Sequence, residues 1–291
     1  MILSPIEQSI KRKIEAVGTP LKDWDIQINY GIKTGFNDAF IITSEKRNEI
    51  LSNCATEDER KKTDELIRPI LRGRDIRRYS YDWANLWLIW VPWHFPLHRD
   101  NSIQGASEKA EKAFREQYPA VYNHLLQYKE QLAARNKAET GIRYEWYALQ
   151  RWGANYWEEF FRPKIIYPNM TKYMPFLYDE KGYFTNQKCF IITGKYIAYL
   201  TAFLNSSLFK YCFRDSFPEL QGGTRELSKI FFEKIQVKQI TEERNEEYKS
   251  IVDAIQKRQS IDAALLIDKM IYMDYGLNDA EIQTIGFVEI V

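Results

Sequence analysis

Apolar residues recur at several spacings along the chain, and each spacing predicts a different element. Helical spacing predicts a short basic helix over residues 5–17 and a long helix over residues 241–275. Asn278 with Glu281 forms a capping-box-like start for a last short helix. Strict alternation over residues 25–30 predicts a strand over residues 24–30. Further strands are expected at 39–42, 86–91, 164–167, 176–178 and 189–192, and further helices at 44–67, 107–135 (two pieces) and 195–214.

The predicted strands come in blocks and do not alternate regularly with helices, which argues against a doubly wound sheet. We therefore expect a mixed α+β fold: a β-rich domain with inserted helices and a C-terminal long helix. The predicted division places the main domain at residues 1–238, with a helical insertion at about 105–140. Residues 239–291 form a C-terminal helical segment.

Charge is distributed unevenly along the 291 residues, although the net charge is only +1. Residues 1–238 carry 36 Lys and Arg against 29 Asp and Glu, whereas residues 239–291 carry 5 against 11. A basic body with an acidic tail can bind a polyanion through one face. The same charges also fit an ordinary protein with an acidic helical end.

Several classes of protein are disfavoured by what the sequence lacks. No apolar run is long enough to span a bilayer as a simple helix, and the start shows no secretory signal pattern. Three cysteines without a CxxC pair argue against a disulfide framework and a zinc finger, and suggest a reducing compartment. Neither a phosphate-binding glycine motif nor a GxSxG or HExxH motif is present. We expect no catalytic residue and no metal site.

Four polar segments are candidates for contact with a nucleic acid: residues 31–38, 68–79, 161–173 and 214–225. Arginine and lysine match phosphates, and Arg, Asn and Gln can pair with base edges. The alternative readings are a tight β connection, a solvated charge run, a strand exit and a glycine turn, respectively. The candidate DNA-binding residues are Lys33, Thr34, Asn37, Arg72, Arg74, Arg77, Arg78, Lys164, Asn169, Lys172, Gln221, Thr224 and Arg225.

The strings at these segments resemble the TaqI-like C-terminal specificity domain, the target recognition domain of N6-adenine DNA methyltransferases and fused type IIG restriction-modification enzymes. The resemblance covers roughly residues 5–287, whereas residues 107–135 match no family motif closely. The strings that carry it are GIKTGFNDAFII, IRPILRGRDIRRY, RPKIIYPNMTKYMPFLYDEKGYFTNQKCFIITG, YLTAFLNSSLFKYCFR with GGTRELSKIFFEKIQV, and IDKMIYMDYGLNDAEIQTI.

The resemblance implies a specificity module that has no catalytic activity of its own. In the family a separate domain binds S-adenosylmethionine and methylates a flipped adenine, and its Asn-Pro-Pro-Tyr type motif is absent here. No cofactor is therefore expected on this chain, and S-adenosylmethionine and magnesium are expected on catalytic partner domains. The implied partners are double-stranded DNA and a methyltransferase or endonuclease domain or subunit, in the cytoplasm of a prokaryote and away from membranes.

The resemblance assigns roles to the candidate residues. Lys33, Arg72, Arg74, Arg77, Arg78, Lys164 and Lys172 would position phosphates, while Asn169, Gln221, Arg225 and some of the other arginines would read base edges. A protein–protein assembly module is the alternative function, in which the 19 Tyr, 16 Phe and 8 Trp would form an interface.

Overall fold

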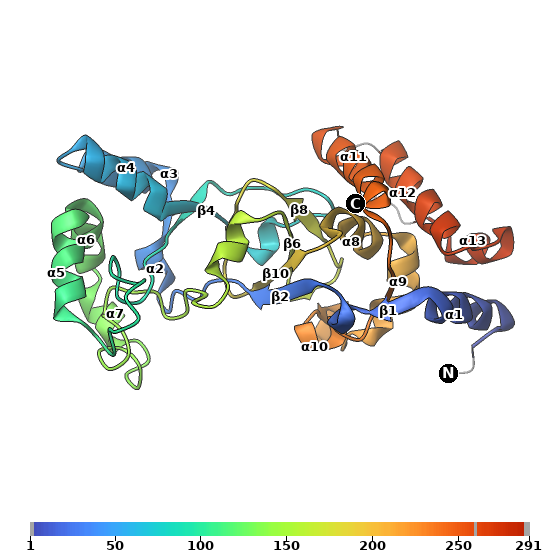
Figure 1. Cartoon of the computed structure of the whole chain (residues 1–291), viewed down its shortest axis with the longest axis horizontal. Helices are drawn as coiled ribbons and strands as arrows, with labels where there is room; N and C mark the ends of the chain where they lie inside the picture. The colour runs from blue at the N-terminus through green and yellow to red at the C-terminus, as the bar shows by residue number, and fades with distance from the viewer. Residues whose placement is uncertain (1–2, 259–260, 288–291) are drawn as a thin grey trace.

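The computed structural model describes residues 3–258 and 261–287. The chain is elongated, with helices at both ends and most of the strands between them (Figure 1). Its strands form several small open sheets, so the fold is α+β as the sequence predicts. None of the described helices is long and apolar enough to cross a membrane.

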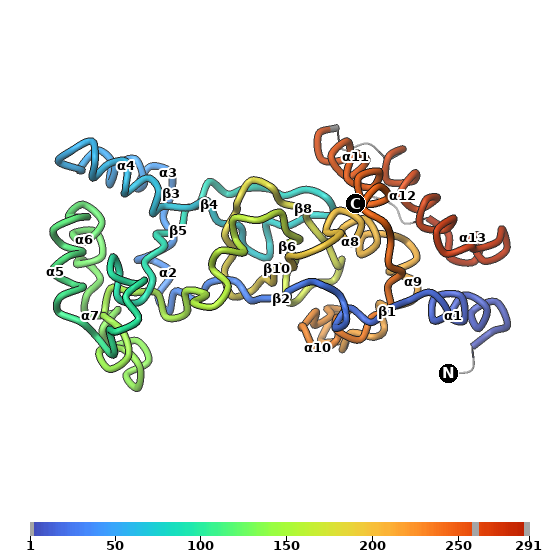
Figure 2. Tube along the Cα trace, viewed as in Figure 1, coloured from blue at the N-terminus to red at the C-terminus, as the bar shows by residue number. Residues whose placement is uncertain are grey.

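A four-stranded antiparallel sheet occupies the middle of the molecule, and its strands come from distant parts of the chain (Figure 2). Every residue of its inner strand over Lys164–Pro168 is buried. Successive side chains point to opposite faces, so Ile165 and Tyr167 enter one hydrophobic core and Ile166 enters another. A strand covered on both faces needs a continuous apolar run. The strand order is β2 (Ile26–Tyr30), β10 (Cys189–Gly194), β6 (Lys164–Pro168) and β8 (Leu177–Asp179).

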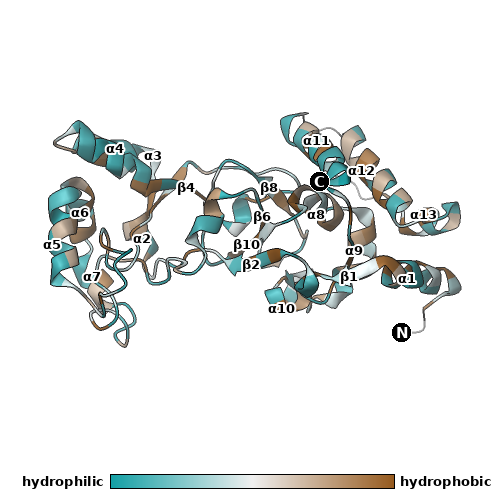
Figure 3. Cartoon of the chain, viewed as in Figure 1, coloured by the Kyte–Doolittle hydropathy of each residue, from teal (hydrophilic) through white to brown (hydrophobic). Residues whose placement is uncertain are grey.

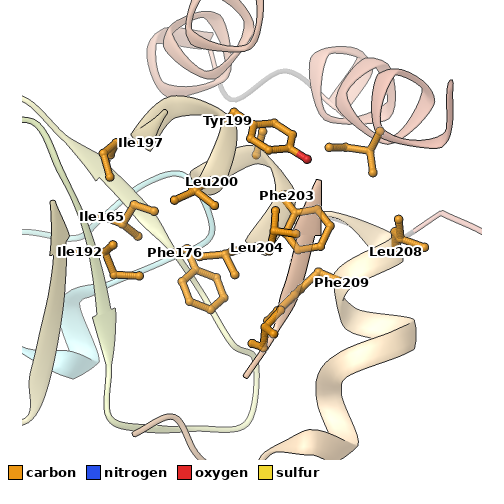
Figure 4. Close-up of a cluster of buried hydrophobic side chains, with 14 of the residues drawn as sticks. Ile165, Phe176, Ile192, Ile197, Tyr199, Leu200, Phe203, Leu204, Leu208 and Phe209 are labelled. Carbon is orange, nitrogen blue, oxygen red and sulfur yellow. The ribbon is translucent and has the colours of Figure 1, made fainter. Parts of the chain in front are cut away.

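One core lies between this sheet and the helices of the C-terminal half. Phe176 and Ile192 face Leu200 and Leu204 across it (Figure 4). Helix α8 (Ile197–Leu204) is buried along its whole length, because the sheet covers one side and α11 (Glu242–Arg258) covers another. The remaining elements around this core are α1 (Pro5–Val17), α9 (Ser207–Phe213), α10 (Lys229–Phe232), α12 (Ile261–Asp274), α13 (Asp279–Ile285) and the antiparallel pair β1 (Gly18–Pro20) with β12 (Gln236–Lys238).

The second core joins the other face of the sheet to a helical lobe at one end of the molecule. Arg135 is buried in the lobe and donates hydrogen bonds to the carbonyl oxygens of Thr34, Trp146 and Ala148. Burial lowers the pKa of this guanidinium to about 10. The lobe contains the sheet β3 (Ile41–Thr43), β5 (Leu86–Ile89), β4 (Ile67–Leu71), β9 (Phe184–Thr185) and the helices α2 (Asn37–Phe40), α3 (Ser44–Ser52), α4 (Glu57–Leu66), α5 (Glu108–Gln117), α6 (Pro119–Leu126) and α7 (Lys129–Ala134).

Polar residues dominate the outer helices α4 and α11 (Figure 3). Helix α1 docks on α13 through the Lys13 ammonium, which lies 2.6 Å from a Glu281 carboxylate oxygen. Helices α11 and α12 pack together, so the predicted long helix over residues 241–275 is wrong. Residues of α11 and α12 share a core with the body, and the division at residue 238 stays a prediction.

Other predicted elements differ from the structure at their ends. Ala39 and Phe40 belong to a helical turn, not to a strand. The predicted helix over residues 195–214 is two helices, because the Ser206 hydroxyl accepts from the backbone N–H of Phe209 and starts a new helix. Three helices, not two, occupy residues 107–135. The helix over residues 5–17 is confirmed.

Candidate nucleic-acid interface

A groove of about 940 Å³ opens beside the central sheet, where several loops meet. Its walls are residues 72–74 and 76–78, the loop that follows β6, and the first part of α9. Asn37 adds the end of the first polar segment. The fourth segment reaches the same region because β11 (Arg225–Glu226) pairs with β7 (Met170–Thr171). The groove therefore brings together residues as far apart in sequence as Asn37 and Lys210.

A short 3-10 turn, Gly73–Asp75, lies within residues 68–79, the arginine segment, and positions its side chains. The Asp75 carboxylate accepts from the backbone N–H of Arg72 at 2.8 Å and from its guanidinium at 3.0 and 2.8 Å. The turn lies close to β6: a Cβ placed on Gly73 would be 3.2 Å from the Cβ of Pro168. Glycine permits this approach, and the turn leaves Arg74 exposed in the groove.

The groove is lined by six cationic side chains and, in the part of the chain that the structure describes, by no acidic one. Arg77 pairs with Asp82, which lies outside the lining, and the Arg78 guanidinium donates to the carbonyl of Asn205. The remaining cations, apart from Arg72 described above, form no ion pair among the described residues. These are Arg74, Lys188 and Lys210.

Lys210, at the wall of the groove, lies close to other cationic side chains. Burial lowers the pKa of its ammonium, and the nearby Arg78 and Arg214 lower it further. Like charges that lie close together raise the free energy of the empty site, and a bound anion would relieve that repulsion. The arrangement therefore suits a polyanion better than a neutral ligand.

Apolar groups line the inner part of the groove. Ile76, Leu204 and Phe209 are buried, whereas Met170 is 48% exposed and Tyr173 is 75% exposed. An exposed tyrosine beside cations can stack on a base or pack against a sugar. The groove thus combines charge with apolar surface, as a nucleic acid requires.

Three of the predicted DNA-binding residues are corrected by burial. The Lys164 side chain is fully buried, and its ammonium lies 2.6 Å from a carboxylate oxygen of Asp179, so a phosphate cannot reach it. Burial lowers the pKa of this ammonium, while Asp179 favours the charged form. Thr34 is buried and donates to the Asn37 side chain. Arg225 is buried beside two carboxylates.

The other predicted residues divide between the groove and its surroundings. Asn37, Asn169 and the four arginines at 72, 74, 77 and 78 line the groove. Lys172 is exposed near Gly222, and Gln221 is exposed on the same glycine turn. Lys33 and Thr224 are half-buried and do not line the groove.

Some groove residues were missed by sequence reasoning. Lys188 and Asn186 lie in the turn before β10, and Lys210 lies on the polar face of α9. A single lysine on a helix carries no local signal of its role. Only the pairing of β10 with β6 brings that turn to the groove.

The described residues contain no group of three or more His, Cys, Asp or Glu side chains that could hold a metal ion. His94 and His98, four residues apart, are engaged elsewhere: His94 Nδ1 lies 2.9 Å from a Glu145 carboxylate oxygen. The His98 ring contacts Trp90, Phe95 and Trp152.

Comparisons with solved structures identify the same architecture in larger proteins. The type IIG restriction endonuclease BpuSI has a TM-score of 0.51 and 13% identity over 94% of this chain and 34% of its own. The type IIL restriction-modification enzyme MmeI, solved in complex with DNA, has a TM-score of 0.56 and 14% identity over 92% of this chain and 36% of its own. The chain thus spans about a third of each. Its sequence matches no curated protein.

The family model named TaqI-like C-terminal specificity domain matches residues 68–240. The match begins within the arginine segment and runs through the central strands to the end of β12, so it contains nearly the whole groove. It covers more than half of the chain, in agreement with the motifs quoted above. This chain belongs to the family of TaqI-like C-terminal specificity domains.

Proposed function

We propose that this chain is the DNA target-recognition module of a restriction-modification system. The observation that carries the proposal is the groove: six cationic side chains, no acidic one among the described lining residues, and exposed Met170 and Tyr173. Duplex DNA presents dense negative charge, so such a groove attracts it at long range. The specificity-domain family and the restriction-modification enzymes of similar fold support the same role.

The division of labour is part of the proposal. The module binds and reads the duplex, and a separate or fused N6-adenine methyltransferase or endonuclease domain performs the chemistry. That domain carries S-adenosylmethionine and magnesium, and this chain carries neither. A prokaryotic cytoplasm is the place for such an enzyme, since the DNA that it modifies is there. Three free cysteines fit a reducing compartment.

The alternative, an assembly module, loses its main support in the structure. The aromatic residues that suggested it lie mostly in the two cores. Those exposed among the described residues are Tyr30, Phe161, Tyr173, Tyr211 and Phe287. Tyr173 lines the groove, where an aromatic side chain also serves nucleic-acid binding.

Fluorescence anisotropy on random-core duplexes, with selection of the bound fraction and sequencing, tests the proposal at two salt concentrations. We expect binding that weakens steeply with salt, since each phosphate contact contributes about −0.9 to the log–log slope. An enriched motif is expected in the selected pool. Absence of binding at low salt, in a sample shown to be folded, contradicts the proposal and favours the assembly module.

A second assay tests the lack of chemistry. The pure chain, incubated with duplex DNA, S-adenosylmethionine and Mg²⁺, should neither methylate nor cleave the duplex. Turnover that follows the protein through purification contradicts the non-catalytic assignment and leaves the DNA-binding assignment intact.

A further inference from the structure

One asparagine at the groove is held by its backbone on both sides. The N–H of Asn169 donates to the carbonyl of Lys188 at 2.8 Å, and its own carbonyl accepts from the N–H of Leu227 at 2.7 Å. These bonds tie residue 169 to the turn before β10 on one side and to the segment after β11 on the other. The backbone of residue 169 is thereby fixed without any contribution from its side chain.

The side-chain amide of Asn169 makes no hydrogen bond to any residue that the structure describes. Its Oδ1 is buried and lacks a partner, although the residue as a whole is only half-buried and lines the groove. A buried polar atom without a partner is costly and rare in folded proteins. A ligand that enters the groove can supply what the protein does not.

The other asparagines of the groove differ in this respect. Asn37 Oδ1 accepts from the Thr34 hydroxyl, and Asn186 Oδ1 accepts from the N–H of Lys188. The side chain of Asn205 makes three hydrogen bonds to backbone groups of buried residues. Those amides maintain loops and a helix end, so Asn169 is the groove asparagine whose amide is uncommitted.

The surroundings of Asn169 suit contact with a base. The 3-10 turn at Gly73 lies against the preceding residue, Pro168, and brings the cationic side chains of Arg72 and Arg74 to the same wall of the groove. Cations beside a neutral amide can hold the phosphates while the amide faces a base edge. An amide has one acceptor and one donor group, which match the N6 amino group and N7 of adenine.

We infer that Asn169 is a specificity-determining residue: its side-chain amide reads the N6 and N7 edge of one adenine in the recognised duplex. The inference rests on the proposed function, which it makes specific to one residue and one base. Gln221 is a weaker candidate because it lies on the exposed short turn Gln221–Gly223. Ordering that turn on binding costs conformational entropy, whereas the backbone of Asn169 is already fixed.

The first test repeats the duplex selection with N169A and N169D in the full chain. The wild type should enrich a motif with an adenine at one position that N169A no longer specifies, while the other positions stay unchanged. N169D loses the donor for N7, and a carboxylate accepts from the cytosine amino group, so the preference should move from adenine towards cytosine. N48D, an exposed site on α3 outside the groove, controls for the added negative charge.

The second test removes one atom from the DNA. Replacing the assigned adenine by 7-deazaadenine removes the N7 acceptor, and the affinity of the wild type should fall at least about fivefold. N169A should bind both duplexes equally, because the contact is already absent. Circular dichroism checks that each variant is folded, which the backbone hydrogen bonds of residue 169 lead us to expect.

The outcomes separate the two proposals. Salt-sensitive, motif-specific binding that N169A leaves unchanged at every adenine overturns the inference about Asn169 and preserves the recognition function. A 7-deazaadenine effect of equal size in the wild type and N169A also overturns it, since another group then reads N7. Absence of any DNA binding overturns both.

Discussion

The groove and the C-terminal helices use their charged side chains in opposite ways. In the groove, Arg74, Lys188 and Lys210 form no ion pair among the described residues. In the C-terminal helices, Arg244 pairs with Glu247 and Asp274. Paired charges hold α11 to α12, whereas unpaired charges of one sign repel each other and raise the energy of the unbound state. The comparison suggests that one region uses charge for folding and the other for binding.

Removing an acidic side chain from the ion pairs between α11 and α12 should lower the stability of the protein and leave its DNA affinity unchanged. Asp274 accepts from the Arg244 guanidinium at 2.9 and 3.1 Å and from the Tyr248 hydroxyl at 2.5 Å. D274A leaves the Tyr248 hydroxyl without this acceptor and the Arg244 guanidinium with Glu247 alone, so the free energy of unfolding should fall by about 2–4 kcal/mol. Urea unfolding measures the loss, and D279A in the exposed first turn of α13 should cost only about 0.5 kcal/mol. A tenfold change in DNA affinity in folded D274A would show that the two regions are not separate.

Removing the unpaired cationic side chains of the groove should weaken DNA binding without lowering the stability of the protein. The triple variant R74A/K188A/K210A should bind duplex DNA roughly 10- to 100-fold more weakly, and its log–log salt slope should be about 2.7 smaller in magnitude. Its free energy of unfolding should stay the same or rise. The matched control replaces three exposed lysines of the helical lobe, Lys61, Lys109 and Lys137, by alanine. Equal losses in both triple variants would mean that net charge matters and the groove does not.

Alkaline pH should weaken binding through Lys210 before it affects ordinary lysines. Burial and two neighbouring arginines lower the pKa of this ammonium, so it loses its proton at a lower pH than the usual value of 10.5. DNA affinity of the wild type should therefore fall a few-fold as the pH rises towards that value. K210R keeps its charge throughout this range and should remove most of that fall. Anisotropy titrations across this range provide the measurement, and an identical pH profile for K210R would contradict the assignment.

The smallest expected change in DNA affinity concerns Arg77, a groove arginine that forms an ion pair at the surface. Arg77 and Asp82 form an ion pair of 2.9 Å in which both side chains are exposed. Such pairs contribute little to stability, so D82N should leave the urea midpoint unchanged. It removes a negative charge near the groove, and DNA affinity should rise about twofold at low salt. Weaker binding by D82N would indicate that Asp82 positions Arg77 for its contact.

The fold class and the arginine segment could be predicted from sequence because both depend on local patterns. Five arginines with one aspartate in residues 68–78 lack the acids that would balance a surface helix, and four of those arginines line the groove. Lys164 was assigned wrongly for the opposite reason. Its partner Asp179 lies fifteen residues away, and only the register of β6 against β8 brings the two charges together. Lys210 was missed because its role depends on what lies across the groove.

The strand order of the central sheet has a consequence for synthesis on the ribosome. Strand β2 is complete at Tyr30, but β10, the strand that it pairs with in the sheet, begins at Cys189. At about 5–20 residues per second, the N-terminal strand must wait roughly 10–30 seconds for its partner. Its apolar side chains stay without a sheet during that time, which exposes the nascent chain to aggregation. Slowing translation between these strands should therefore lower the yield of folded protein and increase its dependence on chaperones.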